Sequence, residues 1–437
     1  MGPAPPSSRI AIVGGGWAGL AAGVWLARHG TSITLFEAGR EPGGRARLLS
    51  SGDGEIDNGQ HILLGAYTQT LELMETVSPG STRRHFLRLP LTLDVPGRFH
   101  LDLPTLPTPL NLALGLLFTQ GLSLKEKWAV ARLMQRIKLL EPHGPSKLNV
   151  EQLLAGQPSA AIDYLWAPLC LSALNTPLHK ASAQVFANVL RDALTGPRAY
   201  SDMLLPRTNL SILFPVPAVS DIQQHGGKVL LGTRISKIVP ASHGVSLESP
   251  GQTWNFDQVI LACAPQHAAQ LLAPLPELQA TCHALVAFQF QPIVTAYLDY
   301  PDTVSLPFPL IGLADEAAHF AFDQGYTHGR AGRLAVVTSA EHPAPPGGRS
   351  GRIRHIHQTL QSVLGPLPEP TTWRIIEEKR GTFECDADLG RPGHATEHPR
   401  VYLAGDYTLG PYPATLEGAV RSGVQCAKML CGARHEA

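Results

Sequence analysis

The sequence predicts an α/β fold that begins with a βαβ unit and carries a second, α+β domain inserted between parts of the first. Three observations lead to this prediction. Residues 9–47 alternate strand-like and helical patterns around a glycine-rich turn. Strand-like runs of the same kind return at residues 256–262 and 401–404, near the other end of the chain. The regions between have a different character, Leu-, Ala- and Pro-rich with helical periodicity in 83–206 and strand-rich in 285–379.

The βαβ unit is read from three consecutive segments. Residues 10–13 are an apolar β run, residues 20–28 have the composition of a helix, and residues 33–36 form a second apolar run. Gly30 closes the helix, as glycine commonly does at a helix C-terminus. A strand, a helix and a second strand in this order predict the start of a parallel sheet.

The turn before this helix has the spacing G-x-G-x-x-G. Gly14 permits a tight turn, Gly16 lets the backbone approach a pyrophosphate, and Gly19 lets the helix pack close to the strands. The helix N-terminus offers unpaired N–H groups and a partial positive charge to phosphates. Glu37 ends the second strand and can accept hydrogen bonds from both ribose hydroxyls. Glycine clusters also make ordinary turns, but the complete unit predicts a dinucleotide site.

Composition excludes some partners and indicates a compartment. The chain has 437 residues and a formal net charge of +0, which provides no electrostatic case for nucleic-acid binding. Its six cysteines form no C-x-x-C pair, so we expect free buried thiols in a reducing cytoplasm. Residues 1–8 lack the basic and apolar regions of a secretory signal and suggest a short disordered tail. A cytoplasmic protein is therefore expected.

No apolar run is long enough to predict a transmembrane helix, which needs roughly 18 residues. The nearest is residues 110–117, which follow a proline-rich stretch. Two interpretations are open for this run, a buried helix or a surface helix that touches a bilayer. Peripheral contact with the inner face of the cell membrane is thus compatible with the sequence.

Two further segments near the βαβ unit carry candidate functional residues. Gly43, Gly44 and Arg45 lie just past the second strand, where they either contact a pyrophosphate or form a surface turn with a solvated arginine. Residues 55–61 are dense in polar side chains, which suggests a loop facing the cofactor. His61 in this segment either donates a proton in catalysis or is a structural histidine.

The inserted region is apolar. Residues 124–140 and 150–154 have helical periodicity, and residues 166–174 form a strongly apolar helix that precedes Asn-Thr-Pro. Such helices usually belong to a core. A helical insert this apolar is also suited to wall a tunnel for an apolar substrate.

The end of the chain supplies a third candidate segment. A strand ends at Gly405-Asp406, and Pro413 is placed as the starter of a final helix. Asp406 would hold ribityl hydroxyls, and the N–H groups near Leu416 would face the anionic edge of a flavin. The alternative is an ordinary strand, loop and helix with an N-capping aspartate.

Together these motifs resemble the FAD-containing amine oxidase and phytoene desaturase superfamily, and the match runs from end to end. The resemblance implies a Rossmann-like FAD-binding domain of the amine oxidase and glutathione reductase type. It places the AMP ribose at Glu37, the pyrophosphate at Arg45, adenine at the backbone of Ile235, and the flavin at Asp406 and Leu416. The full predicted cofactor set is Gly14, Gly16, Trp17, Ala18, Gly19, Glu37, Ala38, Gly43, Gly44, Arg45, Gly59, Gln60, His61, Ile235, Gly405, Asp406, Thr415, Leu416 and Ala419.

The resemblance also sets the expected domain boundaries. The FAD-binding domain is expected to comprise residues 1–82, 207–284 and 380–437. The substrate-binding domain is expected to comprise residues 83–206, as a helical insert, and 285–379, as a sheet.

A narrower resemblance rests on longer motifs. Residues 57–61 (DNGQH), 168–171 (PLCL), 174–177 (LNTP), 213–215 (LFP) and 378–383 (EKRGTF) look like those of the squalene-associated flavoproteins, the hydroxysqualene dehydroxylases of bacterial hopanoid pathways. This family implies a C30 isoprenoid substrate and reduction of hydroxysqualene to squalene by reduced FAD, with loss of water.

That reaction needs a hydride from the flavin and an acid that releases water. His61 is the candidate catalytic acid, and Glu417 and Tyr412 are poorer candidates. An apolar, water-poor pocket would suit charge that develops on the allylic carbon.

Some features depart from related families. Thr415 stands where monoamine-type oxidases place an aromatic residue, and there is no recognisable cysteine for covalent flavin attachment, so non-covalent FAD is expected. Only one G-x-G-x-x-G unit is present, which leaves the electron donor unidentified. A carotenoid desaturase or amine oxidase is the alternative enzyme. A non-enzymatic relative resembling the GDP-dissociation inhibitors, which bind prenylated partners without FAD, is disfavoured by intact Glu37, Arg45 and Asp406.

Overall fold

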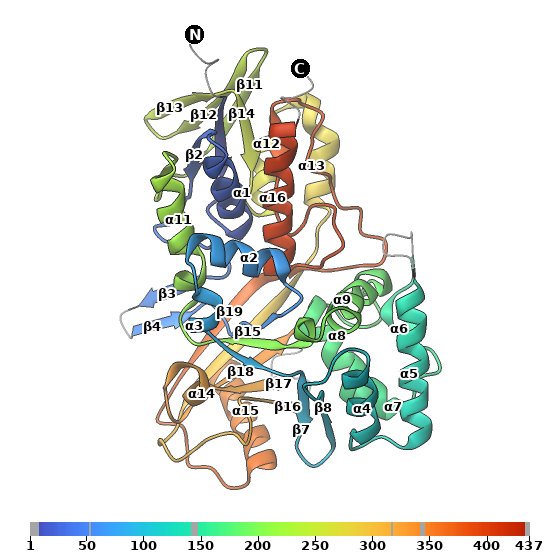
Figure 1. Ribbon diagram of the computed structural model, residues 1–437. Coiled ribbons are helices and arrows are strands. Elements are labelled where there is room, and N and C mark those ends of the chain that lie inside the picture. The colour runs from blue at the N-terminus through green and yellow to red at the C-terminus, as the bar shows by residue number, and fades with distance from the viewer. Residues whose placement is uncertain (1–7, 52–53, 141–146, 316–317, 341–345, 433–437) are drawn as a thin grey trace.

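The computed structural model describes residues 8–51, 54–140, 147–315, 318–340 and 346–432, so the N-terminal tail considered above lies outside the described residues. Two five-stranded sheets organise the chain (Figure 1). The first is parallel, with the order β10-β2-β1-β14-β20. Its strands are β10 (Lys228–Leu230), β2 (Ser32–Phe36), β1 (Arg9–Val13), β14 (Gln258–Leu261) and β20 (Val401–Leu403).

Both faces of this parallel sheet are buried. Ile10 and Ile12 of β1 pack in one apolar cluster with α1 (Trp17–Arg28), α11 (Pro215–Gln224) and α16 (Leu416–Gly432). Ala11 and Val13, which alternate with them, pack in a second cluster on the opposite face. That face is covered by β11 (Lys237–Ala241), β12 (Gly244–Ser249), β13 (Gln252–Phe256), α12 (Pro265–Leu272), η3 (Pro276–Leu278) and α13 (Gln279–Val286). The sequence pattern predicted this α/β class, and the structure confirms it.

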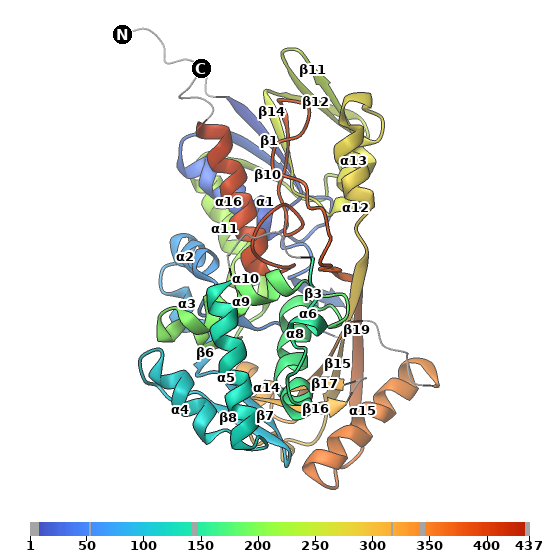
Figure 2. The same cartoon turned by 90° about the vertical axis from the view of Figure 1, so that its right-hand side faces the viewer.

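The second sheet is antiparallel, with the order β16-β17-β18-β15-β19. Its strands are β15 (Phe290–Asp299), β16 (Leu310–Asp315), β17 (Ala318–Asp323), β18 (Arg333–Ser339) and β19 (Thr372–Phe383). One face packs on α15 (Gly348–Leu364), through Ala296, Val336 and Ile356 among others. The long strands β15 and β19 run side by side from this sheet towards the first one and end below α12 (Figure 2).

The region 83–206 is mainly helical. Its helical segments are α3 (Ser81–Arg84), α4 (Leu110–Phe118), α5 (Leu124–Leu139), α6 (Val150–Leu153), α7 (Ser159–Ala161), the π-turn η1 (Ile162–Trp166), α8 (Ala167–Leu174), α9 (Ala183–Thr195) and η2 (Arg198–Ser201). The interpretation of residues 110–117 as a buried helix is wrong, because Leu110 and Leu117 of α4 are 57% and 52% exposed. This part of the chain therefore carries both core helices and an exposed apolar helix.

Several short strands in and beside this region were not predicted from the sequence. They are β3 (Leu48–Ser51), β4 (Gly54–Asp57), β5 (Leu63–Leu64), β6 (Phe86–Leu89), β7 (Thr92–Val95), β8 (Phe99–Asp102) and β9 (Met203–Pro206). Strands of two to four residues contain too few alternations for a pattern to emerge. The remaining short helices are α2 (Thr68–Val77), α10 (Leu210–Leu213) and α14 (Gln324–His328).

Ile235, the predicted adenine contact, lies in the loop before β11, which begins at Lys237. One predicted boundary is corrected by the structure. The final helix begins at Leu416 rather than at Pro413, because Thr415 caps it by accepting a hydrogen bond from the Gly418 N–H at 3.1 Å.

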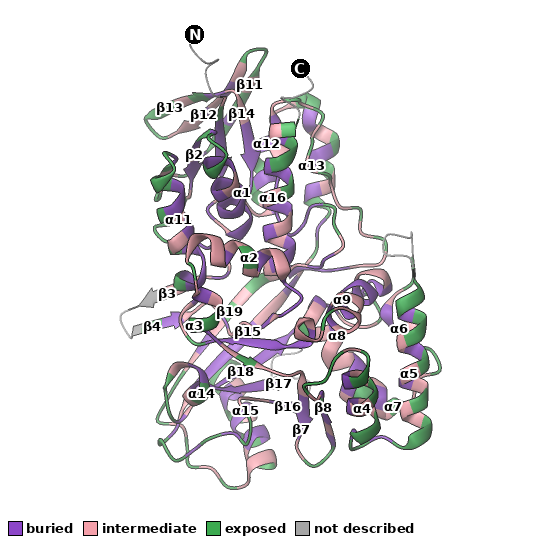
Figure 3. Ribbon diagram, viewed as in Figure 1, coloured by how far each residue is buried: buried purple, intermediate pink, exposed green. Residues whose placement is uncertain are grey.

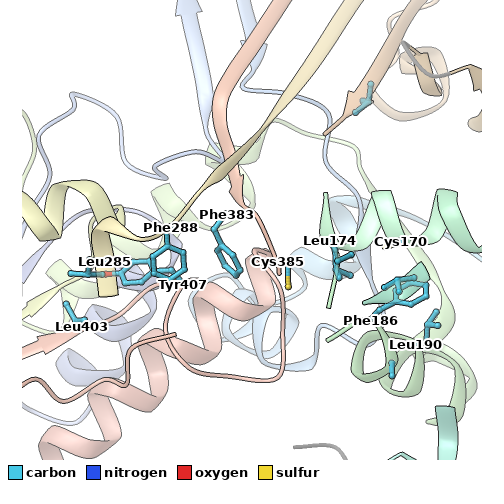
Figure 4. Close-up of a cluster of buried hydrophobic side chains, with 14 of the residues drawn as sticks. Cys170, Leu174, Phe186, Leu190, Leu285, Phe288, Phe383, Cys385, Leu403 and Tyr407 are labelled. Atoms are coloured by element: carbon cyan, nitrogen blue, oxygen red, sulfur yellow. The ribbon is translucent and has the colours of Figure 1, made fainter. Parts of the chain in front are cut away.

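A cluster of buried side chains joins the first sheet to the helical region (Figure 4). Phe288 packs against Phe383 and Tyr407 with ring centroids 5.5 and 5.9 Å apart. Cys385 continues this packing towards α8, where its N–H donates to the Thr176 hydroxyl at 3.0 Å. Residues far apart in sequence thus share one core, and this holds the two sheets in a defined relation to each other.

Candidate active site

A cavity of about 860 Å³ lies at the carboxyl ends of the first sheet and extends over the second. Residues at or just past the ends of β1, β2, β14 and β20 border it, as do residues of β15, β17, β18, β19 and α8. Ligands in open α/β folds bind at this edge of the sheet. The position of the cavity therefore follows from the topology.

The glycine-rich turn lines one end of the cavity. Gly14 has φ 117°, and a Cβ there would come within 2.6 Å of the Ala262 carbonyl oxygen, so only glycine fits. A Cβ on Gly16 would meet nothing closer than Gly44 Cα at 3.9 Å, which leaves the backbone open to a ligand. Gly19 does not border the cavity; a Cβ there would lie 2.0 Å from the Gly14 carbonyl oxygen. Its role is close packing, as the motif predicts.

The N-terminus of α1 is suited to an anion. Gly16 is its N-cap residue and provides no side-chain hydrogen bond, and the first turn contains no acidic residue. Trp17 and Ala18 of this turn border the cavity. The N–H groups at the start of this twelve-residue helix are therefore available to phosphate oxygens.

Glu37 lies at the same end of the cavity as the glycine-rich turn. Its carboxylate accepts hydrogen bonds from the N–H groups of Gly15 and Gly39, at 2.7 and 2.6 Å. These bonds fix the side chain against the glycine-rich turn, where its remaining acceptor capacity faces the cavity. The arrangement fits the recognition of ribose hydroxyls.

The Gly43-Gly44 segment lies directly against the first turn. Gly43 N–H donates to the Gly15 carbonyl at 2.7 Å, and Gly43 and Gly44 have φ 115° and 62°. Such dihedrals favour glycine and bring two loops into backbone contact. Arg45 then reaches across the cavity, where it donates to the Asp406 carboxylate at 2.5 Å and to the Gly381 carbonyl at 2.8 Å. Arg45 was expected to contact a pyrophosphate. In this structure it pairs with Asp406, which was expected to contact the flavin.

His61 borders the middle of the cavity. Its Nδ1 lies 3.1 Å from the Gly59 carbonyl, which can only accept, so Nδ1 carries a proton in the neutral ring. Burial, with a smaller contribution from the Arg45 charge, lowers the pKa of His61 below its usual value of 6.5. Asn58, beside it, donates to the Arg45 carbonyl at 2.7 Å. His61 is therefore mainly neutral at pH 7, and its imidazolium form gives up a proton more readily than that of an exposed histidine.

The two poorer acid candidates lie elsewhere. Glu417 is fully buried, accepts hydrogen bonds from Thr70 and pairs with Arg421 at 2.7 Å. The Tyr412 hydroxyl donates to Asp192 at 2.6 Å, and burial raises its pKa well above the usual range. Neither residue borders the cavity. Their environment assigns both to packing rather than proton transfer.

The far end of the cavity is mostly apolar and comes from the second sheet, which lies in residues 285–379, the segment expected from the sequence to form the sheet of the substrate-binding domain. Its residues alternate along each strand: Ile293 and Thr295 on β15, Phe320 and Phe322 on β17, Val337 and Ser339 on β18, and Ile376 and Glu378 on β19. Leu171, Ser172 and Ala173 of α8 close the opposite side. The period of two along residues 290–299 was the available signal, but sequence alone does not show which face borders a cavity.

The structure brings most of the predicted cofactor residues around this one cavity. All except Gly19 border it, namely Gly14, Gly16, Trp17, Ala18, Glu37, Ala38, Gly43, Gly44, Arg45, Gly59, Gln60, His61, Ile235, Gly405, Asp406, Thr415, Leu416 and Ala419. The backbone cradle, the uncapped helix and the ribose-facing carboxylate together fit a dinucleotide such as FAD. All six cysteines are free, as predicted, but only four are buried, because Cys263 and Cys431 are partly exposed.

Comparison with known proteins agrees with this geometry. The family model described as flavin containing amine oxidoreductase matches residues 17–431. The hydroxysqualene dehydroxylases of Rhodopseudomonas palustris and Sinorhizobium fredii are 28% and 27% identical to this chain, covering 98% and 96% of it and 99% and 97% of their own lengths. Cyclohexylamine oxidase from Brevibacterium oxydans has a similar fold, with a TM-score of 0.70 at 17% identity, over 98% of this chain and 100% of that one.

Both resemblances read from the sequence are thereby confirmed. The match to the family model spans almost the whole chain, from Trp17 at the start of α1 to Cys431 in the last helix. The chain therefore belongs to the flavin-containing amine oxidoreductase family, and it is an FAD-dependent oxidoreductase.

Proposed function

We propose that this enzyme reduces hydroxysqualene to squalene with loss of water, in squalene and hopanoid biosynthesis. The observation that carries the proposal is the continuity of one cavity, polar and glycine-rich at one end and lined by Ile293, Phe322 and Val337 at the other. An apolar C30 chain fits such a lining, and its hydroxyl-bearing carbon would lie towards the polar end. Relatives named for this reaction match along nearly their full length.

The cofactor would be non-covalently bound FAD, held by the glycine-rich turn, Glu37 and the segment around Asp406. Cys263 borders the cavity, but burial raises the pKa of its thiol to about 12, so the nucleophilic thiolate is scarce at neutral pH. When bound and reduced, the flavin supplies the hydride that replaces the hydroxyl group. The donor that reduces it is unidentified.

The chain itself would position the substrate and provide the proton. His61 is proposed as the acid that protonates the departing hydroxyl, because it borders the cavity and its lowered pKa makes the imidazolium a readier proton donor. Apolar side chains from β17 and β18 would exclude water from the reacting carbon. Glu417 and Tyr412 are not part of this proposal.

The proposed substrate indicates where in the cell the enzyme works. We expect a cytoplasmic enzyme that works at the membrane surface, since its proposed substrate partitions into lipid. None of the described helices is both long and apolar enough to cross a bilayer.

We also propose a division into two domains. The FAD-binding domain would comprise residues 1–82, 207–284 and 380–437, and the substrate-binding domain would comprise 83–206 and 285–379. Strand β19 crosses the last of these boundaries.

Anaerobic turnover tests the proposed reaction. The FAD-loaded chain is incubated with hydroxysqualene and a chemical reductant, and squalene is detected directly by mass spectrometry. Squalene should form only when the flavin is reduced, and oxidised FAD serves as the control. No squalene from a fully flavin-loaded, reduced protein would exclude the proposal. Dehydrogenation of phytoene by the oxidised enzyme would instead support a carotenoid desaturase.

A further inference from the structure

Helix α4 has an inverted arrangement of side chains. Asn111, its one strongly polar residue, is 1% exposed, whereas Leu110, Leu117 and Phe118 are 57%, 52% and 74% exposed. Gly115 lies on the inner side, where a Cβ would come within 2.5 Å of a Leu103 methyl group, so the helix packs closely through its smallest residue. A water-facing helix normally shows the opposite pattern, because apolar side chains leave water.

Helix α5 extends this apolar surface. Leu124, Trp128 and Leu139 are 75%, 65% and 82% exposed, and helical geometry places them on one side. Lys127 Nζ donates to the Leu117 carbonyl at 2.6 Å and so joins the end of α4 to the start of α5. Figure 3 shows exposed residues along both helices, which lie next to each other at one edge of the molecule. We call the exposed side chains of these two helices the α4–α5 surface, namely Leu110, Leu117, Phe118, Leu124, Trp128 and Leu139 with the basic residues Lys125, Arg132, Arg136 and Lys138.

Basic residues flank the apolar side chains on α5. Lys125, Arg132, Arg136 and Lys138 are exposed. The only acidic residue of α5 is Glu126, whose carboxylate accepts a hydrogen bond from the Ser123 N–H at 2.7 Å in a capping box. The chain as a whole has a formal net charge of +0, so this surface is a local concentration of positive charge.

We propose that the α4–α5 surface docks on the anionic face of a lipid bilayer. Apolar side chains with a tryptophan at the boundary and a rim of Lys and Arg match the interfacial zone and acidic headgroups of such a membrane. Helix α4 has nine residues, about 14 Å, against a hydrocarbon core of about 30 Å, so it lies in the interface rather than spanning it. A second copy of the chain is a poorer occupant, because pairing this surface with itself would bring like charges together.

The inference deepens the proposed function, since an enzyme held on the bilayer can draw a C30 substrate directly from it. It also stands apart from that function, because binding to vesicles is measured without turnover. If the protein turns over hydroxysqualene but does not bind vesicles, only the docking proposal is contradicted. If it binds vesicles but does not turn over hydroxysqualene, only the proposed substrate is contradicted.

The test uses the FAD-loaded full chain and vesicle flotation. Vesicles of equal parts phosphatidylcholine and phosphatidylglycerol should carry the protein upward, and vesicles of phosphatidylcholine alone should carry about tenfold less. The double variant Leu117→Glu/Phe118→Glu should lose at least about tenfold in partitioning to the anionic vesicles. Arg132→Glu/Arg136→Glu should lose a similar factor, and this loss should shrink at high salt.

Val286→Glu is the matched control. Val286 is 60% exposed on α13, a helix that lies in the upper half of Figure 1 whereas α4 lies in the lower half, so its substitution should leave flotation unchanged. Flavin absorbance and thermal unfolding confirm that each variant is folded. The proposal fails if the wild type does not float with anionic vesicles or if Leu117→Glu/Phe118→Glu floats as well as the wild type. Conversion of a dimer to a monomer by that variant, without vesicle binding by the wild type, would instead assign the surface to self-association.

Discussion

Arg45 and Asp406, 361 positions apart in the sequence, form an ion pair of 2.5 Å across the cavity. Asp406 follows β20 of the first sheet, and Arg45 follows β2. The pair therefore connects the two ends of the chain at the place where the flavin is expected. The Asp406 side chain is 8% exposed, so its charge is shielded little by water.

Asp406→Asn should weaken FAD binding by about tenfold or more, because it removes a charged acceptor at the cofactor site and frees Arg45 from its partner. Fluorescence titration of the apoprotein with FAD measures the dissociation constant. The control is Asp388→Asn, because the Asp388 carboxylate also forms an ion pair, with Lys147, but is 69% exposed. An unaltered dissociation constant in Asp406→Asn would contradict the placement of the cofactor.

Glu37→Arg should weaken FAD binding by roughly ten- to a hundredfold, because it removes hydrogen bonds to a charged group that are worth about 1.5–3 kcal/mol each. It also releases the N–H groups of Gly15 and Gly39, which the carboxylate now holds. Glu41→Arg, an exposed charge reversal in the same loop, should leave binding unchanged. Equal flavin occupancy in both variants would show that Glu37 does not contact the cofactor.

If His61 is the acid, turnover depends on its protonated form. Burial lowers its folded pKa below 6.5, so log kcat should fall by about one unit per pH unit above that lowered pKa. His61→Gln should remove this pH dependence and reduce kcat by roughly a hundredfold or more. The free energy of unfolding should change with pH in the opposite direction to kcat. The fold favours the neutral His61 ring, so the contribution of His61 to stability is present above pH 6.5 and is lost as pH falls through its lowered pKa. A His61→Gln variant with the wild-type pH profile would exclude the role.

Val337→Trp should obstruct the apolar end of the cavity. Val337 pairs with Phe320 on β17, and both side chains border the cavity. A larger side chain there should raise KM for a C30 substrate at least about tenfold, with flavin content unchanged, since the cofactor end is distant in the cavity. Val239→Trp, on the exposed strand β11, is the control for introducing tryptophan. Unchanged steady-state kinetics in Val337→Trp would place the substrate elsewhere.

Asn175→Ala should destabilise the fold by about 2–4 kcal/mol, because it breaks several buried hydrogen bonds at once. Asn175 Oδ1 accepts from the Ala340 N–H at 2.5 Å, and its Nδ2 donates to the Thr382 hydroxyl at 2.9 Å. These bonds attach the end of α8 to the second sheet. Chemical denaturation gives the free energy of unfolding, and Asn255→Ala on β13, an exposed site, should change it little. A similarly small change for Asn175→Ala would show that the attachment is not needed.

Much of the dinucleotide half of the site was predictable because its chemistry is local. The strand, the turn at Gly14 and Gly16, and the strand end at Glu37 fall within 29 consecutive residues, positions 9–37. Each glycine is required by a backbone constraint that acts over a few residues. For this reason the order of elements and the position of the cofactor turn could be read without coordinates.

The substrate half was not predictable in the same way. The sequence assigned a helical insert and the sheet at residues 285–379 to the substrate-binding domain, but it did not show which of their residues would line a cavity. In the structure, Leu171, Ser172 and Ala173 of α8 border the cavity together with alternating residues of the second sheet. A strand pattern shows which residues share a face, not what that face meets. Likewise, residues 110–117 were recognised as apolar, but only the packed structure shows that their leucines face outward.

By itself, the sequence determined the fold class, the family and the segments that border the cavity at the end of the first sheet, because these depend on contiguous motifs and local backbone geometry. Only the tertiary structure decided that Arg45 pairs with Asp406, that Glu417 is buried in an ion pair with Arg421, and that α4 exposes its apolar side. Those contacts depend on chain closure over long separations and on which surfaces are covered. Both are properties of the packed whole rather than of any single segment.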